Sequence, residues 1–174
     1  MLKGIILAFL HVFILIWTIG FLFVFRKRIS VMIGMAAAMC IGMVIGFGTG
    51  ILTAILLPSQ FASAALIGTA IGMAAGAAAG CMIGLAAVLD GILAGAMAGM
   101  MGAMLVAMLP SSQQQDVLFF SIVISGLIQF VLTLVLQENA ETHHARAPQR
   151  LFRSPALPFC IIAAAAVLAI SVSR

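Results

Sequence analysis

The sequence contains very little charge. Of its 174 residues only 7% are Asp, Glu, Lys or Arg, 65% are hydrophobic, and there is no tyrosine and a single tryptophan. Because soluble domains carry about 25% charged residues, this chain lacks the polar surface that a soluble fold needs to cover itself. Lipid is therefore the expected solvent, and a lipid bilayer is the first expected partner.

Cysteine and catalytic motifs are also scarce. Cys40, Cys81 and Cys160 all lie in apolar segments, where a thiol behaves as a small hydrophobe, so no disulfide framework is predicted. The sequence shows no Ser-His-Asp arrangement, no paired catalytic carboxylates, no P-loop and no dinucleotide fingerprint. We therefore expect a protein that is not an enzyme. The net charge of +4 comes from basic clusters between apolar runs, which act as topology signals and predict no nucleic-acid partner.

Long apolar runs fill the chain. They predict one integral membrane domain over residues 1–174, an all-α polytopic transmembrane bundle of about six spans, since each run approaches the length that crosses about 30 Å of hydrocarbon. Pro58 and Pro110 break the pattern, and Asp90-Gly91 predicts a turn at which Asp90 caps the following helix. The expected spans are 4–25, 29–57, 62–89, 92–109, 117–136 and 156–172.

The basic residues predict the orientation. Lys and Arg collect in cytoplasmic loops, and six spans with both termini outside satisfy this rule best. The residues then placed on the cytoplasmic side are Arg26, Lys27, Arg28, Arg146, Arg150 and Arg153. The stretch from Asp90 to Met104, DGILAGAMAGMMGAM, resembles small Gly/Met-rich bacterial membrane proteins that are uncharacterised. That resemblance implies a bacterial cytoplasmic membrane and no particular activity.

Glycines recur every four residues in the second, third and fourth spans. Helices in lipid gain little from hiding apolar surface, so they associate by close backbone approach, which glycine permits. The spacing predicts a glycine-zipper core built from these three spans, closed either within one chain or between copies in a homo-oligomer or larger membrane complex. The helix-packing residues expected are Gly34, Gly42, Gly46, Gly50, Gly68, Gly72, Gly76, Gly80, Gly84, Gly91, Gly95 and Gly99.

Methionine is abundant, with twelve residues, and several share a helix face in the second and fourth spans. Thioether and thiol sulfurs suit Cu(I), but methionine also fills irregular gaps beside glycine. The pairs Met35-Met39 and Met100-Met104, together with the GxxxG pattern, locally resemble copper transporters of the Ctr type, although those have three spans. The resemblance implies Cu(I) as the ion bound. The candidate metal ligands are Met35, Met39, Met43, Met100, Met104, Met108, Cys40 and Cys81.

Few other polar residues fall in the spans. His11 and Gln129 are expected to bond between helices, and the run from Glu141 to His144 is expected to lie in a solvated loop between residues 137 and 158. Two functions remain open on these observations. One is a small transport component for a soft metal ion such as Cu(I), and the other is a non-catalytic structural or assembly protein that packs or oligomerises through its glycines.

Overall fold

The computed structural model describes residues 20, 30–110 and 113–143, and their regular structure is helical throughout. It contains α2 (Val31–Leu56), α3 (Phe61–Cys81), α4 (Leu85–Met108) and α5 (Gln114–His143). All four are long and apolar enough to cross a membrane. The predicted all-helical class is therefore confirmed for the described part of the chain, and its four helices have the length and composition of membrane spans. The spans predicted at 4–25 and 156–172 lie outside the described residues, so the number six stays a prediction.

The helix ends follow local chemistry. Ser30 caps α2, since its Oγ accepts a hydrogen bond from the Ile33 backbone N–H at 3.4 Å, satisfying one of the N-terminal amides that have no partner inside a helix. At the other end the N–H of Leu57 bonds the Thr53 carbonyl at 2.9 Å, and Pro58 then prevents the helix from continuing. The predicted break at Pro58 is confirmed.

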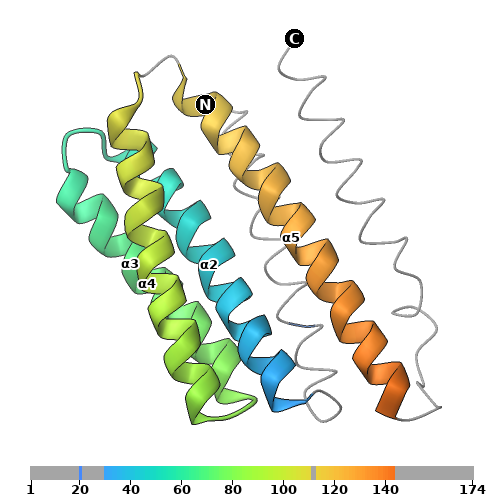
Figure 1. Cartoon of the computed structure of the whole chain (residues 1–174). Helices are drawn as coiled ribbons and strands as arrows, with labels where there is room; N and C mark the ends of the chain where they lie inside the picture. Colours follow the sequence, from blue (N-terminus) through green and yellow to red (C-terminus); the bar gives the residue numbers. More distant parts are fainter. Residues whose placement is uncertain (1–19, 21–29, 111–112, 144–174) are drawn as a thin grey trace.

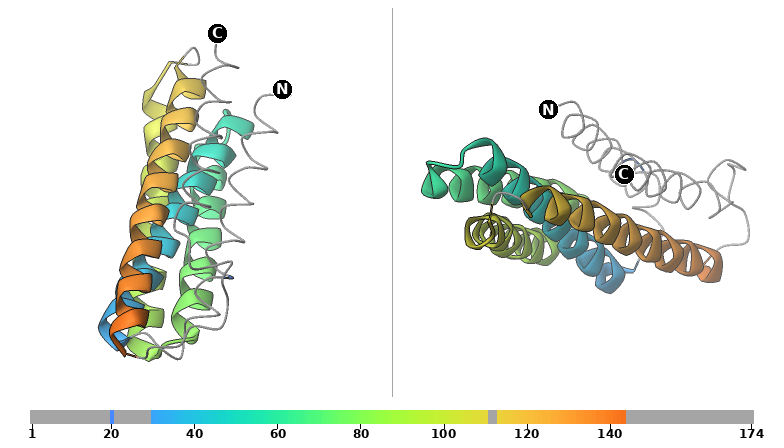
Figure 2. Two further views of the ribbon diagram at one scale, coloured as in Figure 1. Left: turned by 90° about the vertical axis from the view of Figure 1, so that its right-hand side faces the viewer. Right: turned by 90° about the horizontal axis from the view of Figure 1, so that it is seen from above.

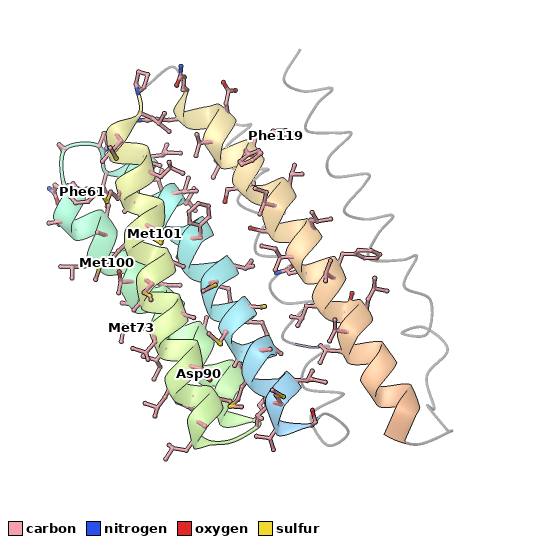
Figure 3. The ribbon with its side chains drawn as sticks, in the orientation of Figure 1. Phe61, Met73, Asp90, Met100, Met101 and Phe119 are labelled. Atoms are coloured by element: carbon pink, nitrogen blue, oxygen red, sulfur yellow. The ribbon has the colours of Figure 1, made fainter. Side chains whose placement is uncertain are left out.

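The predicted turn at Asp90-Gly91 is wrong. The turn lies at Met82–Gly84, where the Gly80 carbonyl accepts hydrogen bonds from the N–H groups of Ile83 (2.9 Å) and Gly84 (3.0 Å). Asp90 instead lies half-buried inside α4, near the end that joins α3 (Figure 3), and it caps no helix. Gly84, predicted within the third span, is the exposed residue before α4.

The packing of α3 on α4 explains this difference. The two helices run antiparallel with Gly76 against Gly91 and Gly72 against Gly95. That register closes the hairpin between Gly80 and Ala87, which also lie in contact. A turn at Asp90-Gly91 would set Gly76 opposite Leu105 and Gly80 opposite Met101, and the close backbone approach would be lost. The pairing of small residues therefore outweighs the local turn signal of an Asp-Gly pair.

Helix α5 is also longer than expected. It continues through His143, so the stretch from Glu141 to His143 is helical and does not lie in a loop. A helix of 30 residues extends about 45 Å at 1.5 Å per residue, longer than the hydrocarbon core. The candidate span within it is the 21-residue segment Asp116–Leu136, so the residues of α5 after Leu136 are not needed to cross the lipid.

Helices α2, α3 and α4 form a tight group, and α5 lies along α2 on the side away from α3 (Figures 1 and 2). Two apolar clusters join α5 to this group. In the first cluster Leu132 and Leu136 pack with Ala37, Ile41 and Ile45 among others. The second lies nearer the opposite end of α5.

In the second cluster Leu118 and Ile122 pack with Ile51, Ala54 and Val106 among others. The first cluster joins the start of α2 to the end of α5, and the second joins the end of α2 to the start of α5. Helix α5 therefore runs antiparallel to α2. The α5 helix is thus attached by bulky side chains, whereas the other three helices approach through glycine.

Two threonines reinforce the contact between α2 and α3. The hydroxyl of Thr53 donates to carbonyls of its own helix and to the Ala64 carbonyl of α3 at 3.0 Å. The Thr49 hydroxyl similarly reaches the Gly68 carbonyl at 3.5 Å. These hydroxyls cross between helices because the neighbouring glycines let the two backbones come close.

Replacing Thr53 by valine should lower stability slightly, because the isosteric side chain cannot donate to Ala64. We expect a loss of about 0.6 kcal/mol, the average for such bonds between membrane helices, measured by titrating the protein from mild detergent into SDS. The matched control is Thr133→Val, whose hydroxyl donates to the Phe130 carbonyl of its own helix. Equal losses in both variants would contradict the interhelical role of Thr53.

Candidate functional site: the glycine contact of three helices

The candidate site is the line along which α2, α3 and α4 meet. In its first layer Gly42, Gly76 and Gly91 face one another. A Cβ atom built on Gly42 would lie 2.6 Å from the Gly91 carbonyl oxygen and 3.3 Å from the Gly76 Cα. A Cβ on Gly76 would meet the same Gly91 carbonyl. Only glycine fits at these three positions, because the obstructing atoms are backbone.

A second layer repeats the arrangement one helical turn away, with Gly46, Gly72 and Gly95. A Cβ on Gly46 would lie 2.5 Å from the Gly95 carbonyl oxygen, and one on Gly72 would lie 2.7 Å from the Gly46 Cα. The three helices thus remain in backbone contact over successive turns. The four-residue spacing along each helix produces this repetition.

The third layer contains Gly50, Gly68 and Gly99. A Cβ on Gly68 would lie 2.7 Å from the Gly50 Cα, and one on Gly99 would lie 2.6 Å from the backbone N of Thr69. Because α3 is antiparallel to its neighbours, its glycines occur in descending order as those of α2 and α4 ascend. All nine glycines of the three layers are buried.

The remaining predicted packing glycines differ in their surroundings. Gly80 faces the backbone of Ala87 and Val88, with a Cβ 2.5 Å from the Val88 Cα. Gly34 faces the flexible side chain of Ile83 at 2.6 Å, so its contact is less demanding. A Cβ on Gly84 would meet nothing within 4 Å, and this residue takes no part in helix packing.

Gly102 is a packing residue that the sequence prediction omitted. It lies outside the four-residue register of α4, yet a Cβ there would lie 2.5 Å from the Phe47 carbonyl oxygen of α2. It follows Gly95 by seven residues, which returns to nearly the same face of a helix. A search for seven-residue as well as four-residue spacing would have found it.

The candidate metal ligands are spread over different environments. Met35 and Cys40 are half-buried against the cluster that contains Ala37 and Leu136. Met39 and Met43 of α2 are exposed, and Cys81 is exposed at the end of α3. Helix α2 thus carries sulfurs in both half-buried and exposed positions.

The methionines of α4 point away from the glycine contact. Met100 and Met104 are each 56% exposed and Met108 is 75% exposed, and Figure 3 shows Met100 and Met101 on the outside of the helix group. Within the described residues no three His, Cys, Asp or Glu side chains gather as potential metal ligands. The α4 sulfurs therefore occupy a surface that faces lipid or a partner.

A row of buried polar side chains on α5 was recognised from the sequence only at Gln129. Ser121, Ser125 and Thr133 are buried with it and recur at four-residue spacing. Among the described residues, the Gln129 Oε1 and the Ser121 Oγ have no hydrogen-bond partner. The four-residue period was the available signal, and it is the one that revealed the glycines.

Comparison of the chain with protein-family models, curated proteins and solved structures gives no match.

Replacing Gly76 by leucine should prevent the three helices from packing, because the new side chain would collide with the backbone of Gly91 and only a shift of a whole helix could relieve it. Overpacking typically destabilises by about 1–3 kcal/mol, and we expect at least that loss, measured as a lower midpoint of thermal unfolding in detergent. Ala78→Leu is the matched control, since Ala78 is exposed on the same helix. Wild-type stability of Gly76→Leu would contradict the backbone contact.

Proposed function

We propose that this chain is a non-catalytic structural protein of the membrane, whose glycine-zipper unit of α2, α3 and α4 serves as a rigid scaffold. The observation that supports this most directly is the triple layer of glycines, in which a Cβ on Gly42, Gly46 or Gly50 would collide with a carbonyl of α4. Helices in such contact cannot rotate or slide without separating, because their backbones interlock. Rigidity of this kind suits a scaffold.

The glycine faces are occupied inside one chain. Gly68, Gly72 and Gly76 lie between α2 and α4, so their surfaces are not free to bind a second copy. A homo-oligomer or larger complex would instead use the outer faces of α3 and α4. Those faces carry exposed large side chains, including Leu66, Ile71, Leu93 and Met101, which can pack against lipid or another membrane helix.

The interior also favours a non-catalytic role. The buried polar side chains in the described residues are Thr69, Ser121, Ser125, Gln129 and Thr133, and none of these is an acid or a base near neutral pH. General acid-base chemistry needs a titratable group held at the reaction centre. That the protein is not an enzyme stays part of this proposal.

The proposed location and topology follow from the charges. Arg26, Lys27 and Arg28 come shortly before α2, so under the positive-inside rule α2 starts on the cytoplasmic side. The Met82–Gly84 turn then lies on the same side, and α5 returns to it. We propose the bacterial cytoplasmic membrane with both termini outside.

Transport of a soft metal ion remains the alternative function. It depends on sulfurs that converge on an ion, and the more than half-exposed side chains of Met100, Met104 and Met108 suit contact with lipid or a partner better. The half-buried pair Met35 and Cys40 on α2 is the feature that keeps the alternative open. Binding of the ion decides between the two functions.

Under the scaffold proposal, Ag(I) or Cu(I) should not bind the purified protein stoichiometrically. We expect no change in the unfolding midpoint when either ion is added, measured by isothermal calorimetry and thermal unfolding in detergent. The variant with leucine at Met35, Met39, Met100 and Met104 should behave like the wild type, because leucine conserves volume. One ion bound per chain, lost in that variant, would overturn the scaffold proposal in favour of transport.

A further inference from the structure

The interface between α2 and α5 is apolar at both ends and polar in the middle. Leu132 and Leu136 lie in one apolar cluster with α2 residues up to Ile45. Leu118 and Ile122 lie in the other with α2 residues from Ile51 onward. Between the clusters lie residues 123–131 of α5 and the part of α2 around Gly48.

This middle segment combines small and polar residues. On α5, Ser125 and Gln129 continue the helix face that carries Leu118, Ile122, Leu132 and Leu136, because the successive spacings of three and four residues keep them aligned. Ser125 and Gln129 are 3% and 5% exposed. They are therefore enclosed in the interface.

Each of the two helices also has a buried glycine between its two clusters. Gly48 of α2 and Gly126 of α5 are both buried, and Gly48 lies outside the four-residue register that serves the contact with α3 and α4. Neither places a side chain in the segment. The two glycines therefore offer no side-chain hydrogen bond to Ser125 or Gln129.

Hydrogen bonding here is incomplete. Among the described residues the Gln129 Oε1 and the Ser121 Oγ find no partner, although Ser121 is only 1% exposed. Buried polar groups in folded proteins are nearly always paired with protein or with ordered water, and an unpaired one costs about 1–3 kcal/mol. Lipid chains can supply no donor.

The depth of this segment makes the shortage more severe. The candidate span of α5 runs from Asp116 to Leu136, so Ser125 and Gln129 lie near its centre and close to the bilayer midplane. Bulk water does not reach that depth through lipid. A partner for the Gln129 oxygen must be held by the protein itself.

We propose that the middle of the α2–α5 interface holds internal water, which donates hydrogen bonds to the Gln129 Oε1 and to the Ser121 Oγ. Residues eight apart on a helix are separated by about 12 Å along its axis, with Ser125 midway between them, so two molecules would serve the two groups. Buried waters typically make about three hydrogen bonds, which the serine and glutamine groups and nearby carbonyls can provide. The helix bundle then holds protein-bound water near the bilayer midplane.

Water contact at Gln129 can be measured directly. The full chain is isotope-labelled in lipid nanodiscs, and magnetisation transfer from water to protein N–H groups is recorded by NMR. The Gln129 side-chain amide is assigned by its loss in Gln129→Leu. We expect transfer several-fold above that to the backbone amide of fully buried Ala103, with exposed Gln60 as the positive control. Transfer no greater than at Ala103 would show a dry interface and overturn the proposal.

A second variant tests the space itself. Gly48→Val should fill the segment and abolish water transfer to Gln129, whereas Ala36→Val, at an exposed position of the same helix, should leave it unchanged. If a folded Gly48→Val retains full transfer, the proposed water position is wrong. If that variant does not fold, the wild-type measurement alone decides.

Discussion

Close contact between helix backbones inside lipid is the interaction on which the rest of this structure depends. Lipid tails are as apolar as leucine, so three helices gain little by exchanging lipid for one another unless their atoms come closer than side chains allow. Glycine permits that approach. In the layers formed by Gly42, Gly46 and Gly50 with their partners, carbonyl oxygens of α4 occupy the positions where side chains would otherwise be.

Several other features follow from this contact. The antiparallel register of α3 and α4 places the turn at Met82–Gly84, and the same closeness lets Thr49 and Thr53 reach carbonyls of the adjacent helix. Large side chains are displaced to the outside, which explains why Met100 and Met104 are exposed. Helix α5 is attached differently, through bulky clusters with a polar middle, so the protein combines a backbone-packed unit with a side-chain-packed helix.

The two modes of packing differ in what they tolerate. A glycine in the three-helix contact is surrounded by backbone, and a larger residue there must displace a helix. Along α5 the neighbours of Leu132 and Ile122 are side chains, which can change rotamer. The buried polar residues Ser125 and Gln129 lie on the α5 face that carries this more adaptable contact.

Composition and spacing were enough to predict a membrane-spanning helical protein, the end of α2 before Pro58 and the faces on which the glycines lie. These features depend on local sequence and on the lipid solvent alone. The turn at Met82–Gly84 depended on which helix faces which. The spacings of Gly102 and Ser121 were present in the sequence, but the helix that each one faces was not. A single helix's periodicity shows which residues share a face, but the partner and the register are chosen by contacts between residues distant in sequence, as when Gly76 meets Gly91 and thereby overrides the turn signal of Asp90-Gly91.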